Sequence, residues 1–156
     1  MVGEFMKKYL SLFCLLTFLL ASTAFAAQLF AGYGKQPWGA SVMSVSKAYP
    51  KGTLAKLGTQ DTYKQLNPSR EIKQRTFAFA ANKLVAVSVT MDPAYVKKNG
   101  IEKLLAKQKK QYGDGVIDRS GAPHMVKYLW QDQSTRITFA YAPKRPEMTV
   151  LMYEKK

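Results

Sequence analysis

Very few side chains in this chain have the types and spacing for acid–base or nucleophilic chemistry. The single histidine, His124, follows Ala122-Pro123 at an expected strand entrance, and the nearest carboxylates along the chain are Asp114, Asp118 and Asp132. Catalysis generally needs titratable groups that converge in a pocket. A lone loop histidine is more typical of a surface residue than of a general base. We therefore predict that the protein is not an enzyme and has no catalytic residue.

Motifs for metals, phosphates or cofactors are equally scarce. The stretch Asp114-Gly115-Val116-Ile117-Asp118 offers carboxylate oxygens, but it lacks the alternating ligands of a calcium loop and is better interpreted as a turn. There is no glycine-rich phosphate loop and no nucleophile elbow. We expect neither a metal nor a cofactor.

Positive charge is the strongest chemical signal. The chain has 24 lysines and arginines against 10 acidic residues, a formal net charge of +14. Such a charge attracts polyanions over long distances, although it also serves solubility alone. The densest group lies on an expected helix, and it comprises Lys97, Lys98, Lys103, Lys107 and Lys110. These lysines are the predicted site for a polyanion such as lipopolysaccharide or extracellular DNA; the alternative is a solvated helix face.

The first 26 residues have the pattern of a secretory signal peptide. Met6-Lys7-Lys8 is a short basic region, residues 9–20 are almost entirely apolar, and Ala24-Phe25-Ala26 is a small-x-small cleavage site. The apolar run is shorter than the ~20 residues of a membrane-spanning helix. We expect a mature chain that begins at Ala27, has no transmembrane segment and resides in the bacterial periplasm or exterior. Residues 1–5 indicate an upstream start codon or a cloning remnant.

The only cysteine, Cys14, lies inside the apolar run. Cleavage after residue 26 would leave none, which excludes disulfides, thiol catalysis and cysteine-bound metals in the mature chain. Leu12 and Phe13 stand before Cys14, where a lipid-modified cysteine would follow small residues. A lipoprotein is therefore not expected.

The elements that would position these side chains occur twice. TFAFA stands at residues 76–80 and TFAYA at residues 138–142, and with a shift of one residue Tyr49-Pro50 aligns with Tyr112-Gly113. A matching helix end and strand at nearly one spacing predict a duplicated unit. We expect an extension at 27–36 and then a single domain over 37–156, made of repeat 1 (37–92) and repeat 2 (93–156).

Each repeat is expected to begin with a helix. In repeat 1, Ser41 is a candidate N-cap, Val45 and Tyr49 follow at helical spacing, and Pro50 ends the helix. In repeat 2, an apolar stripe from Ile101 ends at Gly113. Asp92-Pro93 marks the junction and could start this helix at Ala94, with a break at Gly100.

After each helix, residues alternate with the period of two that is typical of strands. The residues expected on the buried face are Phe77, Phe79, Val85, Val87, Val89 and Met91 in repeat 1, and Val126, Tyr128, Trp130, Ile137, Phe139, Tyr141, Met148, Val150 and Met152 in repeat 2. Tight turns are expected at residues 81–83 and 143–146. The fold class is thus α+β, with one antiparallel sheet and helices packed on one face.

The opposite sheet face is the predicted partner site. Its larger or basic members are Lys64, Leu66, Lys127, Leu129, Arg136, Leu151 and Tyr153, with Thr76, Ala78, Leu84, Ala86 and Thr138 among them. A solvated face usually carries more charge, so exposed leucines and a tyrosine indicate a docking surface. In the alternative interpretation, the N-terminal residues 27–36 fold over it.

One short motif and the layout of residues 37–156 resemble known exported proteins. Gly39-Ala40-Ser41-x-x-x-Val45 resembles the Gly-Met-Thr/Ser-x-x-x-Val opening of small proteins of the SmpA/OmlA type. The tandem helix-plus-meander layout is similar to the β-lactamase inhibitor proteins. The resemblance implies a noncatalytic binding or assembly protein that works through a sheet face. The chain lacks the lipid-bearing cysteine of the first group and the disulfides of the second, so no partner and no binding residue is carried over.

Two functional hypotheses follow. The first is an envelope or extracellular module that docks a protein partner on the open sheet face. The second is a polyanion binder that uses the basic helix. They differ in their response to salt, because binding to a polyanion weakens steeply as salt is added.

Overall fold

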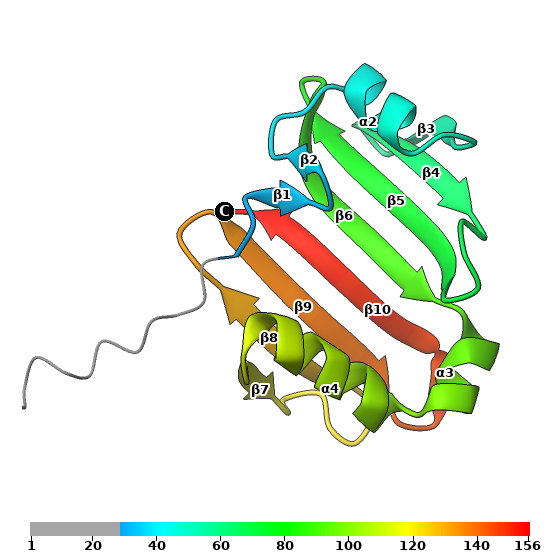
Figure 1. The fold of residues 1–156 in the computed structure, drawn as a ribbon, viewed down its shortest axis with the longest axis vertical. Coiled ribbons are helices and arrows are strands. Elements are labelled where there is room, and N and C mark those ends of the chain that lie inside the picture. The colour runs from blue at the N-terminus through cyan, green and yellow to red at the C-terminus, as the bar shows by residue number, and fades with distance from the viewer. Residues whose placement is uncertain (1–28) are drawn as a thin grey trace, which may run out of the picture.

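The computed structural model describes residues 29–156 (Figure 1). The predicted signal peptide, its Cys14 and the predicted mature N-terminus at Ala27 lie outside the described residues. No helix within residues 29–156 has the length and apolar character that crossing a membrane requires.

The described chain forms three helices, an eight-stranded sheet and a small two-stranded sheet. In chain order they are β1 (Gly32–Tyr33), β2 (Gln36–Pro37), α2 (Val42–Ala48), β3 (Thr53–Leu57), β4 (Gln60–Leu66), β5 (Ile72–Ala80), β6 (Lys83–Met91), α3 (Pro93–Asn99), α4 (Ile101–Tyr112), β7 (Val116–Asp118), β8 (Val126–Gln131), β9 (Thr135–Ala142) and β10 (Arg145–Lys155).

The large sheet is antiparallel throughout and has the strand order β3-β4-β5-β6-β10-β9-β8-β7. Two four-stranded meanders therefore meet at β6 and β10, while the short strands β3 and β7 form the edges. All three helices lie on one face, with α2 over the first meander and α4 over the second (Figure 1). This confirms the expected mixed architecture of a single antiparallel sheet with helices on one side.

The helix ends follow the sequence signals. The Ser41 side chain accepts a hydrogen bond from the Ser44 amide at the start of α2, which ends just before Tyr49 and Pro50. The Asp92 carboxylate caps α3 in the same way. At Gly100 the backbone turns to a φ of 76°, a conformation that glycine adopts at low cost, and this separates α3 from α4.

The core lies between the helices and the sheet. Phe77 and Phe139, the aligned phenylalanines of TFAFA and TFAYA, are both fully buried in it, and Val45, Val96 and Leu104 contribute from the helices. Burial of aromatic and branched side chains is the main stabilising term in such a layer. The prediction that the two phenylalanines belong to the core is confirmed.

A β-bulge in β6 reverses one prediction. Ala78 pairs with Ala86, but Phe79 pairs with Leu84, so Val85 is an extra residue between the two pairs. The bulge turns Leu84 into the core, where it is fully buried. A strict alternation had placed Leu84 on the open face and Val85 in the core, which was wrong, because one inserted residue reverses the side of every residue beyond it.

A second irregularity, in β10, corrects two predicted site residues. The turn consists of Pro143 and Lys144 alone, and the register shifts between Arg145 and Val150. As a result Leu151 and Tyr153 lie on the helix side, where Leu151 is buried and Tyr153 packs against the core. Val150 and Met152 lie on the open face instead of the core. Every residue from 150 to 153 is apolar or aromatic, so alternation could not choose between the two phases.

The N-terminal segment packs on the helix side of the sheet. Leu29 is buried in the core, and Tyr33 lies against Phe77 with ring centroids 5.9 Å apart. The β1–β2 hairpin crosses the sheet between α2 and α4 at one end of β6 and β10 (Figure 1). We call residues 29–37 the N-terminal strap. The alternative in which this segment covers the open face is wrong for the described residues, because they lie on the opposite face.

Candidate functional site

Strand pairing brings five of the seven predicted partner-site residues onto one face. Directly paired residues of an antiparallel sheet point to the same side. One cross-strand row runs from Lys64 through Thr76, Ser88, Met152 and Thr138 to Leu129, and the next runs from Leu66 through Gln74, Thr90, Val150 and Ala140 to Lys127. Arg136 follows in a third row, opposite Glu154. We call this surface the open face.

The open face carries exposed apolar side chains in a defined place. Met152 and Leu129 both flank Thr138, and Val116 pairs with Leu129 at the edge. Val116 is 70% exposed and Met152 is 39% exposed, while Leu66 at the other side of the sheet is 65% exposed. Exposed apolar side chains that gather on one uncovered face are typical of an interaction surface.

Charges on the open face are mostly positive. Lys127 lies 3.6 Å from the Asp118 carboxylate, and Arg136 is the cross-strand neighbour of Glu154. Lys64 has no ion pair with the described residues. Partly exposed ion pairs such as Lys127–Asp118 are weak and can be exchanged at small cost. The face therefore suits a partner with an apolar centre and acidic surroundings.

The basic helix has the predicted exposure. The five predicted lysines, Lys97, Lys98, Lys103, Lys107 and Lys110, all lie exposed on α3 and α4. Within the described residues only Lys107 of the five forms an ion pair, with Glu71 at 3.3 Å. The structure thus leaves four of these charges for solvent or for a polyanion.

No catalytic constellation forms around the titratable residues singled out from the sequence. His124 is exposed and lines a hollow of about 620 Å³ between the β7–β8 loop and the β9–β10 turn, with Lys144 and Arg145 among its neighbours. Asp132 has a structural role in the β8–β9 turn. Across residues 29–156, no three histidine, cysteine or acidic side chains gather closely enough to hold a metal ion.

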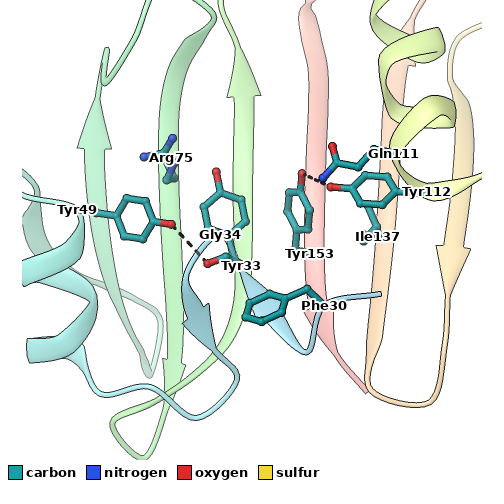
Figure 2. A pocket seen from close by; sticks show the side chains of 10 residues that line it. Phe30, Tyr33, Gly34, Tyr49, Arg75, Gln111, Tyr112, Ile137 and Tyr153 are labelled. Atoms are coloured by element: carbon teal, nitrogen blue, oxygen red, sulfur yellow. Dashed lines mark hydrogen bonds between the residues drawn. The ribbon is translucent and has the colours of Figure 1, made fainter. Parts of the chain in front are cut away.

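A cleft on the helix side was not foreseen. It measures about 320 Å³, lies between α2 and α4 over the centre of the sheet, and is roofed at one end by the N-terminal strap. Figure 2 shows the side chains that line it. They are mainly aromatic or polar, and the principal ones are Phe30, Tyr33, Tyr49, Arg75, Tyr112 and Tyr153.

Four tyrosines cross this cleft from one helix to the other. Tyr49 follows the end of α2, Tyr33 comes from β1, Tyr153 from β10 and Tyr112 is the last residue of α4. The Tyr33 ring centroid lies 5.9 Å from that of Tyr49 and 4.9 Å from that of Tyr153. The hydroxyls of Tyr112 and Tyr153 are 3.4 Å apart. We call this group the tyrosine row.

Glycine at position 34 permits the close approach of strap and helix. Its φ is 59°, and a Cβ there would lie 2.3 Å from the Tyr49 hydroxyl. That hydroxyl donates a hydrogen bond to the Tyr33 carbonyl at 3.4 Å (Figure 2). A side chain at position 34 would therefore both strain the backbone and displace Tyr49.

Electrostatics keep Tyr33 and Tyr153 neutral and the cleft positive. Burial raises the pKa of Tyr33, against the opposing effect of the nearby Arg75 guanidinium. Burial also raises the pKa of Tyr153 strongly, and the neighbouring Tyr112 adds to this. Tyrosines with raised pKa values stay protonated and can donate hydrogen bonds at neutral pH. Arg75 is the charged residue among those that line the cleft.

Two features of the sequence belong to this cleft, although they did not lead to its prediction. Tyr49 and Tyr112 align with each other at the ends of the two expected helices. Arg75 precedes Phe77 and Phe79 at the spacing of two, which places a cation on the face predicted to be buried. The contribution of Tyr33 could not be foreseen, because nothing local to a two-residue strand shows where the strap will pack.

Comparisons with known proteins add little. No family model matches the chain, and no curated protein matches it. Among solved structures, the chain is similar to the crystal structure of a DUF4309 family protein (YjgB) from Bacillus subtilis subsp. subtilis, with a TM-score of 0.44 and 13% identity over 74% of this chain and 78% of that chain. The resemblance to the SmpA/OmlA type and to the β-lactamase inhibitors stays a prediction.

Proposed function

We propose that the protein is a noncatalytic binding module that docks a protein partner on the open face. The observation that carries this proposal is the apolar group of exposed Met152 and Val116 and half-buried Leu129 on a face that no described helix covers. Lys64, Lys127 and Arg136 around it favour a partner whose rim is acidic. The chain is exported, and the partner is a protein of the bacterial envelope or exterior.

The surface lies on two joined meanders, which we propose to be duplicated copies of one unit. The symmetric strand order and the placement of Phe77 and Phe139 in the third strand of each meander support this. The duplication places β6 and β10 side by side, so the copies share one continuous open face.

The proposal is tested by site-specific photo-crosslinking in the producing bacterium. A crosslinking residue at Thr138, between Met152 and Leu129, is expected to capture one protein, whereas one at the exposed Ala106 on α4 is not. The double variant Leu129→Ser/Met152→Ser should reduce capture at least about tenfold, since the loss of a central apolar anchor costs more than about 1 kcal/mol. Capture from Thr138 that the double variant leaves unchanged would refute the proposal.

The second candidate, a polyanion binder, rests on the four unpaired exposed lysines of α3 and α4. Binding of duplex DNA or lipopolysaccharide would fall steeply between about 0.05 M and about 0.2 M salt. The triple variant Lys103→Ala/Lys107→Ala/Lys110→Ala would weaken it, and Leu129→Ser/Met152→Ser would not. Capture of the protein partner should instead survive the added salt and the triple variant, so one titration separates the two functions.

A further inference from the structure

The cleft between α2 and α4 contains a cation that the fold does not neutralise. Arg75 projects from β5 onto the helix side, in register with Gln65 and Val89. No ion pair connects it to an acidic side chain within residues 29–156. Partial burial of a guanidinium without a carboxylate partner costs desolvation free energy. A bound anion would offset this cost.

Hydrogen bonding leaves part of this guanidinium without a partner. Nη1 donates to the Gln65 Oε1 atom at 2.9 Å, which uses the end of the group. Nε is buried without a hydrogen-bond partner among the described residues. Because Nε is buried, the Nη2 donors are those that remain for a ligand. A hydrogen bond from a guanidinium to a carboxylate is assisted by both charges and is therefore strong.

The guanidinium is also held in place by aromatic rings. Its central carbon lies 5.0 Å from the Tyr49 ring centroid and 5.6 Å from that of Tyr33. The cation–π contacts and the hydrogen bond to Gln65 fix the orientation of the guanidinium before a ligand binds. Such preorganisation reduces the entropy that binding would otherwise cost.

The rest of the cleft indicates what is attached to the carboxylate. Phe30 and the tyrosine row offer flat apolar walls, and the hydroxyls of Tyr33, Tyr112 and Tyr153 offer hydrogen bonds. A volume of about 320 Å³ is at the small end of ligand sites. With a single cation in the lining, a monoanion is balanced in charge, whereas a phosphate dianion is not.

We propose that this cleft binds a small organic monocarboxylate with a flat apolar body, whose carboxylate accepts a hydrogen bond from the Arg75 guanidinium. The flat body of the ligand packs against the aromatic walls of the cleft. The site lies on the opposite face from the proposed docking surface. The two proposals are therefore independent and can be tested separately.

The test is a titration of the protein with benzoate, followed by two-dimensional amide NMR. Benzoate is expected to shift the signals of Tyr33, Gly34, Gln111 and Tyr112 together. Benzamide, which has the same shape without the charge, should bind at least about tenfold more weakly, because hydrogen bonds to a charged group are worth more than about 1.4 kcal/mol. Acetate should also bind more weakly, since it lacks the flat body.

Variants locate the site and control for folding. Arg75→Gln should weaken benzoate binding at least about tenfold. Arg75→Lys should weaken it too, because lysine keeps the charge but lacks the planar guanidinium group. Arg70→Gln, at an exposed position between β4 and β5, is the matched control and should bind benzoate normally. If Arg75→Gln fails to fold, Tyr153→Phe, which removes one hydroxyl and keeps the ring, should still weaken binding severalfold. The proposal would be overturned if benzamide bound as well as benzoate, or if the Arg75 variants bound benzoate as the natural protein does. It would also be overturned if benzoate shifted amide signals outside the cleft, or if inorganic phosphate bound more tightly than benzoate.

Discussion

At the scale of single residues, polar side chains join parts of the chain that are far apart in sequence. Thr135 is fully buried; its hydroxyl accepts a hydrogen bond from the Trp38 indole at 2.9 Å and donates one to the Phe30 carbonyl at 2.9 Å. The caps at Ser41 and Asp92 were predictable, because such bonds are local. The bonds of Thr135 were not, since about a hundred residues separate the partners.

Asp132 is the residue for which we predict a pH dependence. Partial burial alone would raise its pKa, but the amides of Ser134, Thr135 and Leu29 donate to the carboxylate and hold the pKa below its ordinary value of 3.8. A lowered folded-state pKa adds stability that is fully present above the unfolded-state pKa and is lost as pH falls through the folded-state value.

Asp132→Asn should therefore lower the free energy of unfolding by about 1–2 kcal/mol near pH 7, because the amide cannot accept from Leu29 as the carboxylate does. The difference from the natural protein should shrink as pH falls below 3.8. Urea unfolding at a series of pH values measures it, with the exposed Asp114→Asn as control. A difference that does not change with pH would contradict this account.

At the scale of elements, the strands were predictable from alternation and their irregularities were not. Phe77 and Phe79 have polar or small neighbours, so their phase was clear. In β6 and β10 almost every residue near the bulge is apolar, which allows either phase. Only packing selects the one that buries Leu84, Leu151 and Tyr153. This is why Leu151 and Tyr153 were assigned to the wrong face and the cleft was not foreseen.

The bulge in β6 predicts unequal effects at neighbouring positions. Leu84→Ala should cost about 2–5 kcal/mol of stability, since it empties a fully buried site. Val85→Ala should cost less than about 1 kcal/mol, because Val85 is only half-buried at the bulge. Chemical denaturation of the two variants checks the ranking. The reverse order would mean that strict alternation holds in solution and that the bulge is absent.

At the scale of the whole molecule, one core extends under both meanders. The buried cluster includes Tyr63 and Phe77 from the first meander and Trp130 and Phe139 from the second, and the strap lies across their junction. The sequence allowed the single sheet and the layer of helices to be predicted, because each meander has one apolar face. It did not indicate that the N-terminal segment completes the core.

We predict that the two halves unfold together. The chain has two tryptophans, Trp38 near α2 and Trp130 in β8. The variant Trp130→Phe keeps Trp38, which bonds to Thr135 of β9 across the junction, and Trp38→Phe keeps Trp130 in the second meander. The fluorescence of each variant should show the same denaturation midpoint as its circular dichroism. Two separate transitions would show that the meanders are independent folding units.

The β8–β9 turn has a consequence for how the molecule can be joined to anything else. Leu29 donates to the Asp132 carboxylate, and the Lys156 amide donates to the Ser134 carbonyl, so both ends of the described chain are tied to the same few residues. A tether or fused domain at either end would therefore project from one corner of the sheet. A short linker between residues 29 and 156 would yield a circular permutant with new termini at another turn.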